Sequence, residues 1–190
     1  MGILKTLFKS PVPVEEKGVS GGYTEKRAER IEIAFAELPK NVKEMKELPE
    51  ATLADPFKTA ALTVCAFCVY VSDAAKGVEM INYLKGPQEL SIYDRQLIKD
   101  NLEGKSYLPF SYFKGAFPEN EYQPSKPYII EVQSNAYSYN EDGYAKMYVQ
   151  SSGSDSLRSI TLRKKAEQWF LWEQMILADI RKPLSADPWA

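Results

Sequence analysis

The chain has 190 residues, of which 44% are hydrophobic and 26% are charged, a composition typical of a folded globular protein. Its 24 Lys and Arg are matched by 26 Asp and Glu, so no excess of positive charge favours nucleic acid, and we expect no such partner. No residue is histidine, which removes the usual proton carrier of catalytic triads and the commonest zinc ligand. We therefore expect no metal, no cofactor and a non-catalytic protein in preference to an enzyme.

The cellular compartment is predicted from three features that the sequence lacks. Two cysteines are too few for a disulfide scaffold, and no signal-peptide pattern opens the chain. The longest apolar run, residues 60–71, falls short of the roughly 20 residues that a membrane-spanning helix needs. These observations predict a cytoplasmic protein.

Residues 1–22 are expected to form a separate segment ahead of a single domain at residues 23–190. Residues 11–22 carry the prolines and glycines of a linker. The first nine residues have an amphipathic pattern, whose apolar side consists of Ile3, Leu4, Leu7 and Phe8. Such a segment is a candidate for weak contact with a membrane surface or for docking in a partner's groove. A frayed or self-docked tail is the favoured alternative, because so short a helix is marginal in water.

Helical spacing dominates residues 24–104. The first helix is predicted over residues 24–38, where Ala28, Ile31, Phe35 and Leu38 recur at three- and four-residue steps. Further helices are predicted over residues 42–48, from Pro56 through the apolar run, over 74–85 and over 91–102. Their caps and stops are Asp55-Pro56, Ser72-Asp73, Gly86-Pro87, and Ser91 with Asp94.

Strand signals follow in the second half. Short β-branched and aromatic runs occupy residues 128–132, 144–149, 157–163 and 169–172, separated by turn-like residues. Helices first and strands afterwards predict an α+β fold with an antiparallel sheet of four or more strands. We expect residues 169–172 to be largely buried, and the terminal Trp189 to anchor the end of the chain on the domain.

The two cysteines are interpreted as core residues. Cys65 and Cys68 have the spacing of redox and metal motifs, but they lie within the apolar run and no other soft ligand accompanies them. Packing explains them better, because free cysteine is among the most buried residue types.

Aromatic residues interleaved with prolines mark residues 107–128 as the candidate binding surface. Its members are Tyr107, Phe110, Tyr112, Phe113, Phe117, Glu119 and Tyr122. Such a segment can grip a peptide or a small ligand, or it can be a long connection that fastens itself to the sheet, which is the favoured interpretation. Residues 163–165, Arg-Lys-Lys, are interpreted as the tip of a hairpin in preference to a phosphate-binding site.

Several short motifs of the sequence resemble those of an uncharacterised bacterial family known only as a domain of unknown function. They include Gln168-Trp-Phe-Leu-Trp-Glu-Gln174, Ala178-Asp-Ile-Arg-Lys-Pro183 and Asp187-Pro-Trp-Ala190. The resemblance implies no activity, cofactor or catalytic residue.

The leading functional expectation is a non-catalytic cytoplasmic interaction or scaffold protein with a protein partner. The alternative is a small-molecule-binding protein, or an enzyme using carboxylates and tyrosines, with its site in residues 107–128. The oligomeric state is left open by the sequence.

Overall fold

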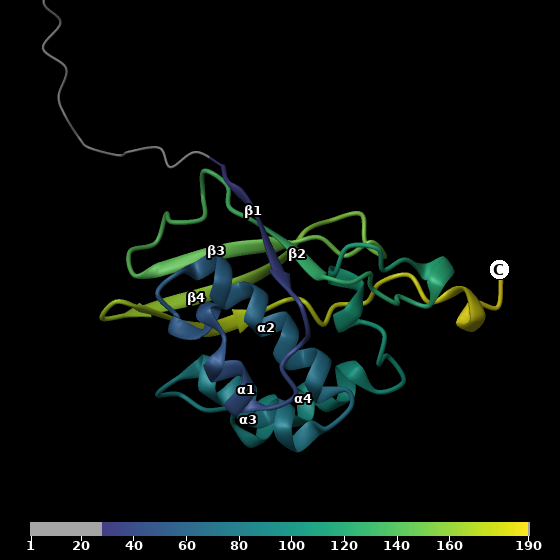
Figure 1. The fold of residues 1–190 in the computed structure, drawn as a ribbon, viewed down its shortest axis with the longest axis horizontal. Helices are drawn as coiled ribbons and strands as arrows, with labels where there is room; N and C mark the ends of the chain where they lie inside the picture. Colours follow the sequence, from purple (N-terminus) through teal and green to yellow (C-terminus); the bar gives the residue numbers. More distant parts are fainter. Residues whose placement is uncertain (1–27, 190) are drawn as a thin grey trace, which may run out of the picture.

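The computed structural model describes residues 28–189, which form an α+β fold (Figure 1). The helices lie mostly in the first half and the strands mostly in the second, as predicted. In chain order the elements are β1 Arg30–Phe35, α1 Val42–Glu47, α2 Pro56–Tyr70, α3 Ala74–Lys85, α4 Ile92–Leu102, β2 Tyr128–Gln133, β3 Tyr144–Val149, β4 Arg158–Lys165 and β5 Gln168–Gln174.

All five strands belong to one antiparallel sheet with the order β1-β2-β3-β4-β5. Strands β2 to β5 follow one another along the chain, so only β1 reaches its neighbour across a long separation. The alternating residues Ala145, Met147 and Val149 of β3 are fully buried, which identifies the face of the sheet that carries the core.

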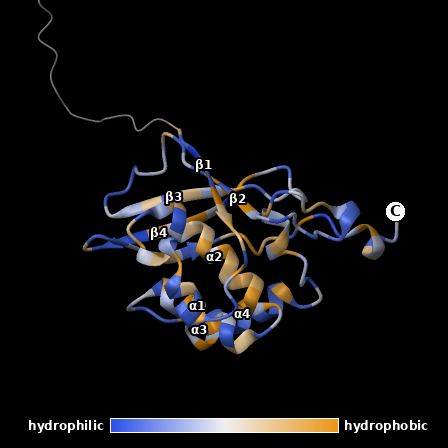
Figure 2. Ribbon diagram, in the orientation of Figure 1, coloured by the Kyte–Doolittle hydropathy of each residue, from blue (hydrophilic) through white to orange (hydrophobic). Residues whose placement is uncertain are grey.

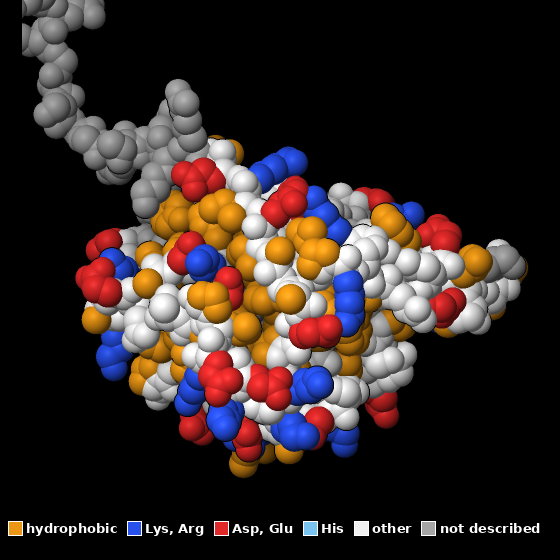
Figure 3. Space-filling model, in the orientation of Figure 1, with side chains coloured by type: hydrophobic (Ala, Val, Ile, Leu, Met, Phe, Trp, Pro, Cys, Tyr) orange, Lys and Arg blue, Asp and Glu red, His pale blue; other side chains and the backbone are white. Residues whose placement is uncertain are grey.

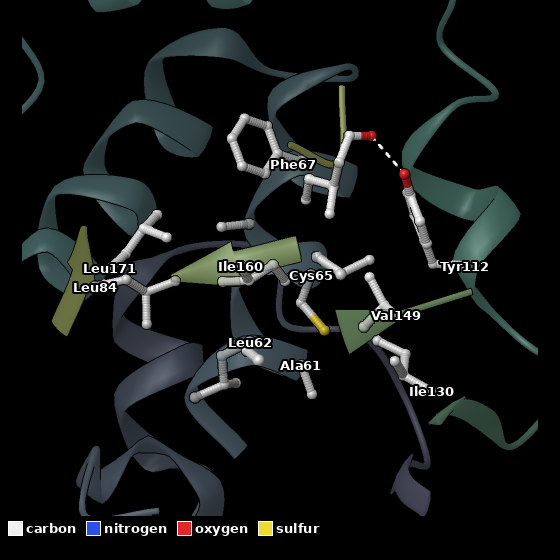
Figure 4. Packing of buried hydrophobic residues seen from close by; sticks show 14 of the residues in the cluster. Ala61, Leu62, Cys65, Phe67, Leu84, Tyr112, Ile130, Val149, Ile160 and Leu171 are labelled. Carbon is white, nitrogen blue, oxygen red and sulfur yellow. Dashed lines mark hydrogen bonds between the residues drawn. The ribbon is translucent and has the colours of Figure 1, made fainter. Parts of the chain in front are cut away.

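Helix α2 covers that face and forms the centre of the core. Asp55 caps it by accepting a hydrogen bond from the Phe57 amide at 2.8 Å, and Pro56 occupies the first helical position. Figure 2 shows apolar residues gathered where α2 meets the sheet. Cys65 and Cys68 are buried and unpaired, which confirms their interpretation as core residues, and Figure 4 shows Cys65 among Ile160, Val149 and Ala61.

Helix α3 packs against α2 through a very close approach. Gly77 lies so near Tyr70 that an added Cβ atom would be 2.3 Å from the Tyr70 Cα. Asp73 caps α3, and the predicted stop at Gly86 is confirmed. Helix α4 begins with a complete capping box between Ser91 and Asp94, also as predicted.

The helix predicted over residues 24–38 is wrong. Residues 24–27 lie outside the described part, and Arg30–Phe35 form strand β1, which pairs with β2 from Arg30 opposite Gln133 to Phe35 opposite Tyr128. Ile31, Ile33 and Phe35 alternate along the strand, with Ile33 and Phe35 buried. Ile31 and Phe35 satisfy the helical and the strand period equally, and pairing with a distant strand decides between them.

Two predictions about tryptophans also fail. Of residues 169–172 only Leu171 is buried, Trp169 and Phe170 are partly buried, and Trp172 is 39% exposed. Among residues 28–189 no second layer of helices covers the sheet face opposite α2. Trp189 is 93% exposed and anchors nothing. The end of the chain is held earlier, by the buried residues Ile176 and Leu177.

Candidate functional site

The aromatic segment at residues 107–128 is fastened to the domain by its own side chains. The Tyr112 hydroxyl donates a hydrogen bond to the Ile176 carbonyl at 2.6 Å, drawn as a dashed line in Figure 4. The Tyr122 hydroxyl likewise donates to the Arg181 carbonyl at 2.7 Å. Burial raises the pKa of Tyr112 well above its usual value and that of Tyr122 to about 12, so both stay neutral at physiological pH.

The seven candidate residues of this segment do not form one surface. Tyr112, Phe113 and Tyr122 are buried, and Tyr107 stacks on Tyr122 with ring centroids 5.4 Å apart. Phe110 is partly buried, whereas Phe117 and Glu119 are exposed. Its binding role stays a prediction, but Tyr112 and Tyr122 use their hydroxyls to hold residues 176 and 181 on the domain, and Phe113 packs edge to face on Tyr128.

Other candidate features lie elsewhere or outside the structure. The apolar set Ile3, Leu4, Leu7 and Phe8 lies outside the described residues. Within residues 28–189 no cluster of three potential metal ligands occurs. No helix in that same part of the chain has the length and apolar character to cross a membrane.

A hollow with a positively charged rim lies where the β4–β5 hairpin meets the end of α3. Its volume is about 200 Å³, and it will be called the basic hollow. Its lining residues are Lys85, Pro87, Gln88, Arg163, Lys164, Lys165, Phe170, Leu171 and Trp172. Four cations and no carboxylate therefore surround an apolar floor, which is the arrangement that attracts an anion attached to an apolar group.

Local structure explains how these groups come together. Strand register places Arg163 opposite Phe170 and Lys164 opposite Trp169. Gly86 ends α3 with a φ of +63°, and a Cβ atom there would come within 2.3 Å of the Phe170 ring. A glycine at this point therefore lets Phe170 lie against the end of α3, so that Lys85 joins the hairpin residues.

Aromatic rings hold the central cation in place. The guanidinium carbon of Arg163 lies 4.6 Å from the Trp172 ring centroid and 5.6 Å from that of Tyr144. These two rings meet edge to face with centroids 6.0 Å apart. Lys164 is paired with Glu167 at 3.7 Å, but within residues 28–189 no ion pair occupies Lys85, Arg163 or Lys165. Those three cations are available to an acidic ligand.

A second hollow continues along β5 toward α4, and it will be called the α4–β5 groove. Its volume is about 270 Å³, and it shares Lys85, Leu171 and Trp172 with the basic hollow. The remaining lining residues are Phe67, Ile81, Leu90, Asp94, Leu97, Ile98, Asn101, Glu173, Gln174 and Met175. The two hollows thus follow one edge strand of the sheet. Elsewhere charges of both signs are interspersed, as Figure 3 shows for one face.

Sequence reasoning singled out the basic residues 163–165 but missed the hollow. It also placed them at the hairpin tip, whereas they form the end of β4 and pair with β5, because the turn begins only at residue 166. A usable signal was that Arg163 and the aromatic run at 168–172 are only a few residues apart. A hairpin brings residues at that separation opposite one another. Lys85 and the groove residues of α4 gave no such signal, because they reach β5 only through the packing of helices.

Together these features define a two-layer α+β protein with two adjoining hollows, apolar and partly basic, along one edge strand. The chain belongs to the family described as Domain of unknown function (DUF6935), whose model matches residues 37–184. That match includes α1 to α4 and β2 to β5, and it excludes β1 and Trp189. No curated protein and no solved structure shows significant similarity to the chain.

Proposed function

We propose that this protein is a non-catalytic interaction protein that recognises an acidic segment of a protein partner at the basic hollow. The observation that carries the proposal is the trio Lys85, Arg163 and Lys165, three cations without ion pairs in the described chain around an apolar floor. A carboxylate next to an apolar or aromatic side chain complements both parts of this arrangement.

Size and preorganisation favour a side chain of a partner over a large cofactor. Pockets for drug-sized ligands usually hold about 300–1,000 Å³, and the basic hollow holds about 200 Å³. Arg163 already lies against the contacting rings of Trp172 and Tyr144, so less side-chain freedom is lost when a carboxylate binds. The guanidinium presents its donors in a fixed fork that suits a carboxylate.

The non-catalytic role is supported by chemistry available in the chain. Without histidine, proton transfer at neutral pH would fall to carboxylates, lysines or tyrosines. Burial raises the pKa values of Tyr112 and Tyr122, so both stay protonated at neutral pH and neither supplies a general base. We place the protein in the bacterial cytoplasm, which suits its two unpaired cysteines.

A random peptide library tests the proposed function directly. The full chain should enrich peptides with Asp or Glu beside Phe, Trp, Leu or Met, and enriched peptides should change the fluorescence of Trp172. Lys165→Glu should weaken that binding by about tenfold or more, as expected for losing a close charge contact. Lys43→Glu, the same charge change on the exposed side of α1, should leave it unaltered.

Two outcomes would reject the proposal. Enrichment without acidic residues, or equal weakening by both substitutions, would remove the basic hollow as the recognition site. Tight binding of a small aromatic carboxylate, with no peptide enriched, would establish the small-molecule alternative instead.

A further inference from the structure

The α4–β5 groove leaves apolar side chains uncovered. Leu97 is 46% exposed on α4, Met175 is 56% exposed just after β5, and Trp172 lies between the two hollows. Helix α4 buries only Ile98 and Leu102. Its face toward β5 therefore stays open, and the groove has room for apolar side chains of another segment.

The charge of the groove differs from that of the basic hollow. Asp94 and Glu173 line it, whereas its single cation is Lys85, at the end shared with the basic hollow. Glu173 has no ion pair among the described residues, and hydrogen bonds from Ser91 lower the pKa of Asp94. An occupant with apolar residues on one side and lysines on another fits this lining.

We propose that residues 1–9 of this same chain dock in the α4–β5 groove as a short amphipathic segment. In the sequence Ile3, Leu4, Leu7 and Phe8 lie on one side of a helical wheel, with Lys5 and Lys9 on the opposite side. The apolar side meets Leu97, Trp172 and Met175, and the lysines lie toward Asp94 and Glu173. This mode of binding is the helix-in-groove arrangement, with both partners on one chain.

Chain length is sufficient for the contact, although residue 28 precedes β1, which lies at the edge of the sheet opposite β5. Fully extended, residues 10–27 span about 60 Å, which is about the length of a path around half the surface of a folded domain roughly 40 Å across. A tether of this kind makes the contact intramolecular, so its occupancy does not depend on protein concentration. Even a weak site is then occupied within one molecule, without high protein concentration.

Spin labelling of the full-length chain tests the inference. Thr6→Cys introduces an exposed-side thiol on the predicted segment, and native Cys65 and Cys68 are too buried to react. A nitroxide attached there should broaden amide signals of α4 and β5 in the isotope-labelled protein. The pattern should persist on dilution and should be absent when separate spin-labelled and isotope-labelled chains are mixed.

Matched substitutions then locate the contact. Leu97→Asp should abolish the broadening, and its exposure makes this change compatible with folding. Ile92→Asp, on the same helix but outside the groove lining and 89% exposed, should leave the broadening intact. Leu4→Asp combined with Leu7→Asp should abolish it from the other side of the contact.

Three results would overturn the inference. The first is no broadening on α4 or β5. The second is broadening that appears only on mixing, which would make a second copy the occupant. The third is binding of residues 1–9 to vesicles of phosphatidylglycerol and phosphatidylcholine while the groove shows no contact without them, which would assign the segment to a membrane surface.

Discussion

Replacing Gly77 by alanine should destabilise the protein, although the same change in an open helix would stabilise it. In a helix interior alanine is favoured over glycine by about 1 kcal/mol. Here the new Cβ would lie 2.3 Å from the Tyr70 Cα and 2.5 Å from its Cβ. Helix α3 must move away from α2 to relieve this, and Met80, Ile81 and Leu84, all fully buried, move with it.

The expected loss follows from two opposing terms. Overpacking costs about 1–3 kcal/mol, with the upper end appropriate for a clash with backbone, and helix propensity returns about 1. The net loss of about 2 kcal/mol should lower the thermal midpoint by about 4–8 °C. Ala75→Gly, at an exposed position of the same helix, should cost up to about 1 kcal/mol from propensity alone. A Gly77→Ala protein that melts at or above the native temperature would refute the close approach of the two helices.

Four further predictions concern the aromatic segment, alkaline pH, the chain end and a helix cap. Tyr112→Phe removes the donor to the Ile176 carbonyl and should lower the unfolding free energy in urea by about 1–3 kcal/mol. The pKa of Tyr122, raised to about 12, means that the unfolded tyrosine ionises first; stability should therefore fall between about pH 10 and 12, and fall less in Tyr122→Phe. Trp189→Ala should change stability by less than about 0.5 kcal/mol, and a larger loss would contradict its exposure. Ser91→Ala should cost about 1 kcal/mol in thermal unfolding by breaking the capping box, whereas an unchanged melt would count against that cap.

Local chemistry predicted the helices α1 to α4 well, because their boundaries depend on caps within the same few residues. Asp55 with Pro56, Asp73, and Ser91 with Asp94 each act at the helix they begin. Strand β1 was mispredicted because its pairing partner lies far along the chain, and nothing within residues 24–38 reveals that partner.

Exposure was predicted less reliably than secondary structure. Aromatic residues on both sides of β5 suggested cover on both faces, but the helices of residues 28–189 cover only the α2 side of the sheet and leave Trp172 partly open. Of the residues that line the two hollows, only the basic run 163–165 stood out in the sequence. The two hollows adjoin at Lys85 and Trp172 because of how the helices pack, which composition and spacing do not encode.

The position of β1 in the sheet has a consequence for biosynthesis. The amide of Glu29, just before β1, bonds to the side chain of Ser134, 105 positions later, so β1 leaves the ribosome long before β2 exists. At about 5–20 residues per second, this interval is on the order of 5–20 s. During it Ile33 and Phe35 have no strand beside them, and an unpaired apolar strand is open to other chains. The nascent chain should therefore need a chaperone most in the interval between the synthesis of β1 and the synthesis of β2.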